Sequence, residues 1–446
     1  MIIKQFFDKG LAHSSYAIIS ENKMVVIDPA RDPKPYYDFA QSNNSKITGV
    51  IETHPHADFV SSHLEIHTQT GATIYNSKLT GANYPHTAFD EGQTISLGKI
   101  KLKAINTPGH SPDSISILLI DENGNEHALF TGDTLFVGDV GRPDLRESAG
   151  NITSKKEDLA RDMYHSTREK IMKLPENVLV YPAHGPGSLC GKSMSAELDS
   201  TIGKEIRENY ALQPMGEDDF VKLLIRDQPF VPKYFGHDVN MNKMGAPSMA
   251  ENIAAVPRGS ADSVLDENVV VIDTRPEEEF KKGHLKNSVN IQEGGKFETW
   301  LGSIVSPEEE FYLIADTEEN LESVIYKTAK IGYEKQIKLA LLQPKNLPVK
   351  SDVFNLEEFK KDPGKFTIVD VRNQSEVKEG KIFESAISIP LPELRERVNE
   401  IPTDKPIVVH CAGGYRSAAG SSIIEQQMKN IEVLDMSEAV AEFSSH

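Results

Sequence analysis

The first half of the chain alternates short apolar, β-branched runs with polar turns. Five of these runs predict strands, at residues 24–28, 47–51, 100–105, 115–120 and 178–181. Two longer stretches, 59–70 and 155–174, predict helices. Histidines and aspartates gather just past the C-terminal ends of the predicted strands. Loops at strand ends are where functional sites are usually built.

The second half contains an internal repeat. Residues 269–291 read VVVIDTRPEEEFKKGHLKNSVNI and residues 366–389 read FTIVDVRNQSEVKEGKIFESAISI. Asp273, Arg275, Glu279 and Gly283 match Asp370, Arg372, Glu376 and Gly380 at an offset of 97 residues. So long a period indicates two copies of one domain. In each copy a buried strand leads into a helix and a second strand, and a further strand follows at 310–314 and at 407–410. This order predicts an α/β fold with a mostly parallel sheet.

These patterns divide the chain into four parts. Residues 1–232 form the first predicted domain, and 233–260 form a linker rich in Pro and Gly with no clear period. We expect at most one short helix in this linker. Residues 261–346 form the middle domain and 347–446 the C-terminal domain.

Composition narrows the class of protein. The 446 residues contain 48 Lys and Arg against 67 Asp and Glu, a formal net charge of −19, which argues against nucleic acid as a partner. No apolar run approaches the roughly 18 residues that would span a bilayer, so we expect no membrane segment. The N-terminus shows no signal-peptide pattern. The two cysteines, Cys190 and Cys411, cannot form a disulfide framework, and a cytoplasmic location is the simplest expectation.

Four short motifs follow the predicted strands of the first domain. They are THPHADF at 53–59, TPGH at 107–110, TGD at 131–133 and PAHG at 182–185. Neutral imidazole and carboxylate are the usual ligands of zinc and iron, and four loops from strand ends can converge on one point. The ordered set therefore predicts a metal site. His63, His67 and His86 stand outside these motifs, and we expect them at the surface.

These motifs resemble those of the metallo-β-lactamase superfamily, whose core is an αββα sandwich. The resemblance covers about residues 1–232. The superfamily commonly holds two metals with HxHxDH, a distant His, a bridging Asp and a last His. Here the last position of the first motif is Phe59, which cannot coordinate, so a two-zinc hydrolase is disfavoured without being excluded.

The remaining residues resemble the persulfide dioxygenase branch of that superfamily. The resemblance implies one Fe(II) per chain, held by His54, His110 and Asp133. Two imidazoles and one carboxylate leave positions open, as in non-haem iron oxygenases. His56, Asp58 and His184 would then orient ligands or water. The alternative for these three residues is a second metal site.

Two further residues of the first domain are candidates with open alternatives. The stretch DTLFVGDVGRPDL at 133–145 is close to a GD…GRxDF stretch of the branch, and Arg142 could hold an anionic group beside the metal, with Asp144 as its support. The alternative is a structural Arg–Asp pair. Cys190, in the glycine-rich loop GPGSLCGKS, could sit at the mouth of a pocket and transfer sulfur, or it could be a small buried residue.

The sequence PIVVHCAGGYRS at 406–417 places Cys411 between a β-branched strand and a helix. Successive backbone N–H groups and a helix N-terminus favour an anion there, so the thiol should ionise readily and a terminal persulfide sulfur could be bound. Arg416 adds positive charge at the rim. A Cys-x5-Arg phosphatase loop would need one more residue before the arginine.

This loop resembles the active-site loop of rhodaneses, in which Cys411 transfers sulfur and Gly413, Gly414 and Tyr415 contact the substrate. The preceding DVR motif at 370–372 also matches that family. The middle domain has no cysteine, and its corresponding loop at 315–320 is acidic and would repel an anionic sulfur species. We therefore expect an inactive rhodanese-like domain there, useful as a scaffold or docking surface.

The whole chain resembles a persulfide dioxygenase–rhodanese fusion. That resemblance implies oxidation of a low-molecular-weight thiol persulfide by dioxygen to sulfite, and sulfur transfer through Cys411 that yields thiosulfate, in sulfide and persulfide detoxification. It also implies a homo-oligomer. The thiol carrier stays open. Two other hypotheses are a two-zinc thioester hydrolase of the glyoxalase II type with a sulfurtransferase domain, and a non-catalytic persulfide sensor.

Overall fold

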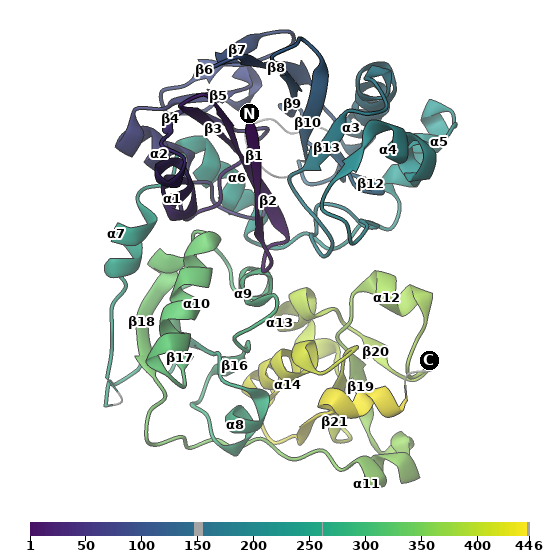
Figure 1. Ribbon diagram of the computed structural model, residues 1–446. Coiled ribbons are helices and arrows are strands. Elements are labelled where there is room, and N and C mark those ends of the chain that lie inside the picture. The colour runs from purple at the N-terminus through teal and green to yellow at the C-terminus, as the bar shows by residue number, and fades with distance from the viewer. Residues whose placement is uncertain (147–154, 261, 444–446) are drawn as a thin grey trace. The chain divides into compact units, whose positions relative to one another are not determined.

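The computed structural model describes residues 1–146, 155–260 and 262–443, which form two compact units (Figure 1). The first unit holds Met1–Glu251 and Lys330–Gly332, and the second unit holds the rest of the chain. Among the described residues, no helix has both the length and the apolar character needed to cross a membrane.

Two six-stranded sheets form the centre of the first unit. The first sheet has the order β1 (Ile2–Asp8), β2 (His13–Ser20), β3 (Lys23–Ile27), β4 (Lys46–Ile51), β5 (Thr73–Asn76) and β6 (Thr87–Ala88). The second has the order β14 (Ser200–Thr201), β13 (Leu179–Pro182), β10 (Glu126–Gly132), β9 (Ile115–Ile120), β8 (Ile100–Asn106) and β7 (Thr94–Leu97). A small ribbon pairs β11 (Leu135–Phe136) with β12 (Asp139–Val140).

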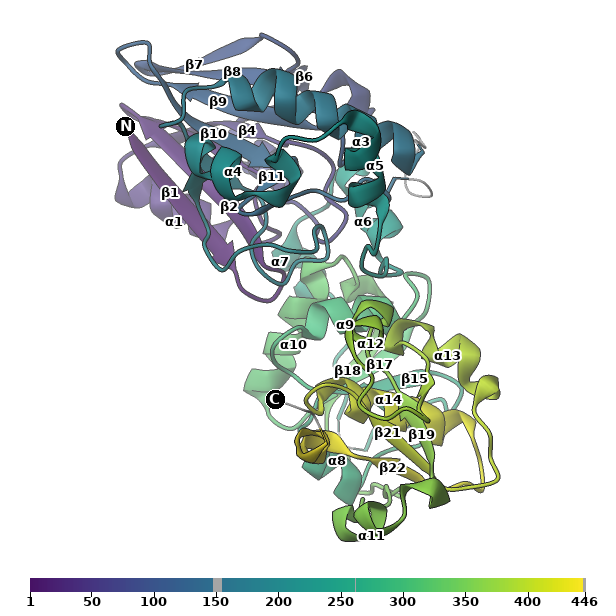
Figure 2. The same cartoon turned by 90° about the vertical axis from the view of Figure 1, so that its right-hand side faces the viewer.

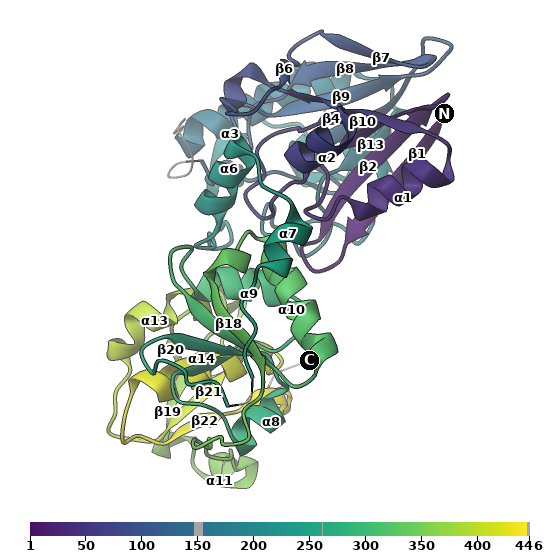
Figure 3. The same ribbon diagram turned by 90° about the vertical axis from the view of Figure 1, so that its left-hand side faces the viewer.

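The alternation of side chains along the strands explains the layers of this unit. In β2, Tyr16 and Ile18 pack between the two sheets, whereas Ala17 and Ile19 face the helices on the outer side. These outer helices are α1 (Lys34–Ser42) and α2 (His63–Thr70), as Figure 3 shows. The second sheet is covered by α3 (Lys156–His165), α4 (Ile202–Glu208) and α5 (Glu217–Ile225) (Figure 2). The unit is therefore an αββα sandwich, which confirms the predicted fold.

The predicted elements of this unit are present with shifted ends. The five predicted strands are found within one residue at either end, as β3, β4, β8, β9 and β13. The helix predicted from residue 59 begins only at His63, because the preceding residues form the histidine-rich loop. The helix predicted to reach residue 174 ends at His165 and continues as a π-helical turn, Ser166–Lys170, and a 3₁₀ turn, Ile171–Lys173.

The stretch expected to be a loose linker is more ordered than predicted. It contains two helices, α6 (Phe235–Met244) and α7 (Met249–Ala254). In α6, the Asn242 side chain accepts a hydrogen bond from Ser61 N–H (2.8 Å) and donates to the carbonyls of His56 (2.9 Å) and Phe59 (2.8 Å). Helix α6 therefore fixes the histidine-rich loop of the first unit. The helix was not predicted because its sequence has no hydrophobic period.

The second unit contains two four-stranded sheets, in both of which all strand pairs are parallel. The middle domain has the order β16 (Ser288–Asn290), β15 (Val270–Asp273), β17 (Phe311–Ala315) and β18 (Ile337–Leu342), with helices α8 (Glu277–Lys282), α9 (Phe297–Ile304) and α10 (Glu318–Lys330). The C-terminal domain has β20 (Ile387–Ser388), β19 (Thr367–Asp370), β21 (Ile407–His410) and β22 (Val433–Asp435), with α11 (Leu356–Lys361), α12 (Gln374–Glu379), α13 (Leu394–Arg397) and α14 (Tyr415–Gln427). The identical strand order confirms that the repeat is a domain.

The repeated D-x-R motif has the same structural role in both domains. Arg372 donates from Nε and Nη2 to the carboxylate of Asp370 and from Nη2 to the carbonyl of Gly380 (3.0 Å). In the middle domain, Arg275 makes the same contacts with Asp273 and the carbonyl of Gly283 (2.8 Å). The guanidinium thus ties the end of the first strand to the end of the following helix.

Candidate functional site

Four loops of the first unit bring histidines and aspartates to one buried place. His54 follows β4, His110 follows β8, Asp133 follows β10 and His184 follows β13. Each of these residues is at most 3 % exposed. The predicted convergence of the four motifs is therefore present in the structure.

His54, His110 and Asp133 form a set suited to a metal ion. Their potential ligand atoms all lie within 4.8 Å of one another. The Oδ2 atom of Asp133 lies 3.7 Å from His54 Nε2 and 3.5 Å from His110 Nε2. Among the described residues, His54 Nε2 and Asp133 Oδ2 are buried without a hydrogen-bond partner. Buried polar atoms are normally satisfied, so these two atoms fit metal ligands.

The protonation state of the two histidines agrees with that fit. His110 Nδ1 lies 2.9 Å from the carbonyl of Arg142, so Nδ1 donates and Nε2 has its lone pair free. Burial lowers the pKa of His54 well below its ordinary value and also lowers the pKa of His110. Both rings are therefore neutral near neutral pH, and neutral imidazole is the form that binds a metal.

The three residues expected to support the ligands lie beside this set. His184 Nδ1 donates to Asp133 Oδ1 (2.7 Å), and His184 Nε2 lies 2.8 Å from Asp58 Oδ2. Burial opposes a charge on His184, but Asp133 and Asp58 outweigh burial and raise its pKa well above the ordinary value. This carboxylate–imidazole contact orients Asp133, as expected for a supporting residue.

The geometry also allows a second metal position. The potential ligand atoms of His56, Asp133 and His184 also lie within 4.8 Å of one another. Both nitrogens of His56 are buried without a hydrogen bond among the described residues, although Nε2 lies 3.2 Å from Asp28 Oδ1. The geometry alone therefore fits either one metal with supporting residues or two metals.

The ring of Phe59 lies among the imidazole rings of the site. It is 1 % exposed, and its ring centroid lies 3.8 Å from that of His13 and 4.5 Å from that of His56. The residue that replaces a coordinating histidine of the superfamily motif therefore points into the site and fills it with apolar atoms.

Two residues of the site stand outside the four motifs. Asp28 ends the predicted strand 24–28 and accepts hydrogen bonds from Thr53 N–H (2.7 Å) and Thr53 Oγ1 (2.8 Å), which fixes the loop before His54. His13 lies at the start of β2 and is 1 % exposed. The position of Asp28 at the end of a predicted strand could have identified it as a site residue. No feature of the sequence identifies His13.

The prediction that His63 lies at the surface is wrong. His63 is fully buried, and its Nδ1 lies 3.5 Å from Glu52 Oε1. Burial and the neighbouring charges of Arg31 and His56 lower the pKa of His63 to about 3. Glu52 comes directly after β4 and is itself buried. The burial of His63 depends on this contact between separate segments, which no local sequence pattern predicts. His86 is exposed as expected, and His67 is half-buried with Nδ1 2.7 Å from the carbonyl of Ala72.

Arg142 is not available as an anion-binding residue. It is 1 % exposed, and its Nε and Nη2 donate to the two oxygens of Asp144 at 2.7 Å each. The remaining N–H groups donate to the carbonyls of Leu189, Pro229 and Phe230. The donors of the guanidinium are thus engaged, and the structural Arg–Asp pair is the correct alternative.

Cys190 is buried rather than exposed at a pocket mouth. It is 1 % exposed, and its sulfur lies in a group with Asp58 and His184 whose potential ligand atoms are within 4.8 Å of one another. Burial and the carboxylates of Asp58 and Asp133 raise the pKa of Cys190 well above the ordinary value. Of the two alternatives for Cys190, the buried position is therefore the one that the structure shows, and its sulfur lies beside the carboxylate of Asp58.

In the second unit, Cys411 lies between β21 and α14. It is 1 % exposed, and the N–H of Gly414 donates to its Sγ at 3.1 Å. Gly414 has a φ of +97°, a left-handed conformation in which a Cβ is strained. The strand, glycine loop and helix expected around this cysteine are all present.

Arg416 is held by a carboxylate of its own domain. Its Nη1 and Nη2 donate to the two oxygens of Glu376 at 2.5 and 2.7 Å. Glu376 is the residue that the repeat pattern singled out as the match of Glu279. The guanidinium is therefore oriented by a bidentate pair beside the Cys411 loop, and Gly413, Gly414 and Tyr415 line a neighbouring cavity.

Comparisons with known protein families cover both units. Residues 8–184 match the family described as the metallo-beta-lactamase superfamily. Residues 260–341 and 355–445 match the family described as rhodanese-like domain.

Individual relatives agree with these matches. A crystal structure of a metallo-beta-lactamase from Staphylococcus aureus is 32% identical, with a TM-score of 0.68, and the match covers 77% of this chain and 98% of that one. The mitochondrial persulfide dioxygenase ETHE1 of Homo sapiens is 28% identical over 189 residues, which is 41% of this chain and 68% of the relative. A hydroxyacylglutathione hydrolase of Dictyostelium discoideum is 32% identical over 178 residues, 38% of this chain and 61% of the relative.

Proposed function

Because this chain belongs to the metallo-beta-lactamase superfamily and has two rhodanese-like domains after that fold, we propose that it oxidises a thiol persulfide and transfers sulfane sulfur. The first unit would convert a low-molecular-weight persulfide and dioxygen to sulfite. The C-terminal domain would move sulfur through Cys411 to give thiosulfate. Removal of excess sulfide and persulfide in the cytoplasm is the expected role.

One observation gives the strongest support to the oxidation step of the proposed function. His54, His110 and Asp133 form a buried set of two imidazoles and one carboxylate, and Phe59 fills the neighbouring space where the superfamily motif has a ligand. Iron(II) in such a set supplies the redox chemistry that activates dioxygen. The similarity to a relative named persulfide dioxygenase favours oxidation over hydrolysis.

The residues of the chain have separate tasks in this proposal. His54, His110 and Asp133 would hold the metal, and His184 and Asp58 would keep Asp133 in position. His110 is fixed in one tautomer by the carbonyl of Arg142. Phe59 and the buried side chains around it would exclude bulk water from the reacting sulfur.

The proposed reactions balance. A persulfide RSSH with O₂ and water gives RSH, sulfite and two protons, so that the outer sulfur is oxidised and dioxygen is reduced. A second persulfide then passes its outer sulfur to Cys411, and sulfite takes that sulfur as thiosulfate. In the second step the S–S bond to the carrier breaks, and the carrier leaves as the thiol.

Metal analysis of the anaerobically purified full chain, followed by oxygen uptake with glutathione persulfide as the probe, tests this function. The proposal expects one iron per chain and oxygen uptake that is lost in His54→Ala. Two zinc ions per chain without oxygen uptake would contradict it. Sulfur binding at Cys411 without any turnover would instead support a persulfide sensor.

A two-metal thioester hydrolase is the second candidate. It is favoured by the second set of potential ligands, His56, Asp133 and His184, and by the similarity to a hydroxyacylglutathione hydrolase. The discriminating variant is Phe59→His, which offers a further imidazole to the second position. Under the dioxygenase proposal this variant gains zinc and loses oxygen uptake, whereas a native hydrolase would hydrolyse a glutathione thioester without any substitution.

A further inference from the structure

Arg146 is a buried arginine of the first unit whose donors are unused. It is 2 % exposed, and among the described residues its Nε, Nη1 and Nη2 are buried without a hydrogen-bond partner. Arg142, four residues earlier, is also buried but donates to a carboxylate and three carbonyls. An unpaired buried charge is costly, and buried polar groups are normally satisfied. Arg146 therefore fits a residue that receives an anion.

The nearby carboxylate of Asp113 does not satisfy Arg146. Its Oδ2 lies 3.8 Å from Arg146 Nη2, which is too long for a hydrogen bond, and its Oδ1 accepts a hydrogen bond from Ser111 Oγ. The two charges attract each other, but the N–H donors of the guanidinium are not used by Asp113. The planar fork of a guanidinium matches the two oxygens of a carboxylate, so a carboxylate is the anion that suits it best.

Lys243 adds a second positive charge beside Arg146. It lies near the end of α6 and is 4 % exposed, and its carbonyl accepts a hydrogen bond from Asn83 N–H at 2.9 Å. Burial and the charge of Arg146 lower the pKa of Lys243, whereas Asp113 raises it. Two cations thus share one carboxylate, which leaves an excess of positive charge at this place. The next residue, Met244, is 60 % exposed, so the cluster lies close to the surface of the unit.

These charges lie beside the loop that carries a metal ligand. Asp113 follows His110 in the loop between β8 and β9, and His110 Nδ1 donates to the carbonyl of Arg142 at 2.9 Å. The Cα atoms of His110 and Asp113 can be at most about 11 Å apart, which is also about the length of an extended tripeptide. A thiol carrier of that size is therefore long enough to place an acidic group at Arg146 and its sulfur at the metal set.

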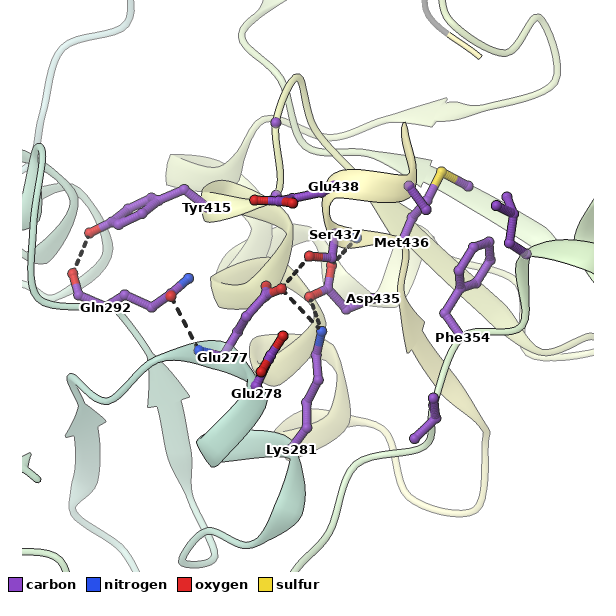
Figure 4. A pocket seen from close by; sticks show the side chains of 15 residues that line it. Glu277, Glu278, Lys281, Gln292, Phe354, Tyr415, Asp435, Met436, Ser437 and Glu438 are labelled. Carbon is purple, nitrogen blue, oxygen red and sulfur yellow. Dashed lines mark hydrogen bonds and ion pairs between the residues drawn. The ribbon is translucent and has the colours of Figure 1, made fainter. Parts of the chain in front are cut away.

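The cavity beside the Cys411 loop is not suited to an acidic carrier. The ammonium of Lys281 there is already paired with Asp435 Oδ2 at 2.8 Å. Carboxylates repel a further anion, so an acidic carrier is expected at Arg146 rather than in this cavity. The cavity has a volume of about 610 Å³, and Figure 4 shows the carboxylates that line it, which are those of Glu277, Glu278, Asp435 and Glu438.

We propose that Arg146 and Lys243 bind a carboxylate of the thiol carrier, so that its persulfide is held at the metal set of the first unit. The substrate class is then an acidic thiol persulfide of about tripeptide size. This inference rests on the oxidation step of the proposed function and names the substrate class of that step.

Isothermal titration calorimetry of the full chain with S-methylglutathione tests this assignment. The methyl group blocks the thiol, so binding reports on the carrier and needs neither oxygen nor turnover. The wild-type chain should bind S-methylglutathione at least about tenfold more tightly than its diethyl ester, in which both carboxylates are blocked. Equal affinities, or no binding of S-methylglutathione, would overturn the proposal. Binding of sodium sulfite in place of S-methylglutathione would assign the site to the product and would overturn it as well.

Arg146→Met removes the charge and keeps a long apolar side chain. It should weaken the binding of S-methylglutathione at least about tenfold. The difference in affinity between the acid and the diethyl ester should then largely disappear, because both changes remove the same contact. Arg146→Lys keeps the charge without the fork and should bind with intermediate affinity. Wild-type affinity in Arg146→Met would show that the guanidinium binds no carrier.

Arg161→Met is the matched control. Arg161 is a surface arginine of the same unit that pairs with Glu217 at 2.8 Å, and its substitution changes the net charge by the same amount. This variant should keep the wild-type affinity for S-methylglutathione, and a loss equal to that of Arg146→Met would contradict a specific site. If Arg146→Met does not fold, Lys243→Met decides, with an expected loss of affinity of at least about threefold.

Oxygen uptake separates this inference from the proposed function. With glutathione persulfide, Arg146→Met should raise the KM about tenfold while kcat changes less than about twofold, because the residue contacts the carrier and not the reacting sulfur. A wild-type KM in Arg146→Met, with oxygen uptake lost in His54→Ala, would overturn the inference alone. No oxygen uptake by the iron-loaded wild-type chain would overturn the proposed oxidation, whatever the affinity for S-methylglutathione.

Discussion

The middle and C-terminal domains have the same framework and differ in one loop. Asp273 is paired with Ile314 in the middle domain, as Asp370 is paired with His410 in the C-terminal domain. The next residue along the strand is therefore Ala315 in one domain and Cys411 in the other. Because the same Asp–Arg contacts hold the framework in both domains, the chemistry depends on the loop after the strand.

The loops after those two positions differ in charge and in backbone. The middle domain continues with Asp316 and then Glu318, where α10 begins, and both are exposed. The C-terminal loop is one residue longer and contains Gly413 and Gly414 before α14 begins. Glycine allows an N–H to turn toward the sulfur, whereas carboxylates at the same place repel an anion. The same fold therefore supports two loops of different charge and backbone conformation.

Replacing the thiol should have the largest effect. Cys411→Ser should reduce thiosulfate-to-cyanide transfer by at least about 10³-fold, because the nucleophile is gone. Placing a thiol in the middle domain by Ala315→Cys, in the Cys411→Ser background, should restore no measurable transfer. Restored activity would show that the glycine loop is not required.

The shared Asp–Arg contacts should stabilise the two domains by the same free energy. Asp273→Asn and Asp370→Asn each leave a buried guanidinium without its charged partner. We expect each substitution to lower the free energy of unfolding of its domain by about 3–5 kcal/mol. Denaturant unfolding followed by circular dichroism measures both, and a loss in only one domain would break the comparison.

Glu376→Gln should have an intermediate effect on activity. The variant loses the bidentate charged pair with Arg416, and kcat/KM for thiosulfate should fall about tenfold. The matched control is Glu279→Gln in the middle domain, where the carboxylate contacts Lys282 at the surface. That control should transfer sulfur at the wild-type rate, and an equal loss in both would exclude a specific role for Glu376.

The same pair predicts a flat pH profile. Burial would raise the pKa of Glu376, but Arg416 outweighs burial and lowers it below the ordinary value of 4.5. The carboxylate therefore stays ionised as the pH falls from neutral, and the pairing is lost only below that value. The ratio of wild-type to Glu376→Gln activity should stay constant down to about pH 5. A ratio that collapses above this pH would contradict the assigned pairing.

Gly414→Ala should have the smallest effect. A Cβ at a φ of +97° is strained, and it would lie 3.3 Å from the backbone of Ser437 and Glu438. We expect a loss of about 1 kcal/mol of stability. Gly380→Ala in the same domain has open space and should change the thermal midpoint hardly at all. Equal shifts of the two midpoints would show that the loop is not constrained.

The sequence predicted the parts of this picture that depend on local pattern. Strand runs, the repeat at 273–283 and 370–380, and the histidines at strand ends all have short-range signatures. The αββα sandwich was predicted from the resemblance of the histidine and aspartate motifs to a superfamily, because the strand pattern alone does not give the order of the layers.

Contacts between distant segments could not be predicted. Arg142 donates hydrogen bonds to the carbonyls of Leu189, Pro229 and Phe230. No sequence pattern predicts a contact with carbonyl groups so far along the chain. The burial of Cys190 and His63 likewise depends on packing of loops from several strands. The pairing of Asn242 with the histidine loop was hidden in a stretch without a hydrophobic period.

Oxygen uptake and product analysis of the iron-loaded full chain with glutathione persulfide test the central claim most directly. The account predicts that Cys411→Ser consumes oxygen at close to the wild-type rate but releases sulfite in place of thiosulfate, whereas His54→Ala consumes none. Oxygen uptake in Cys411→Ser as low as in His54→Ala would contradict the division of oxidation and sulfur transfer between the two units.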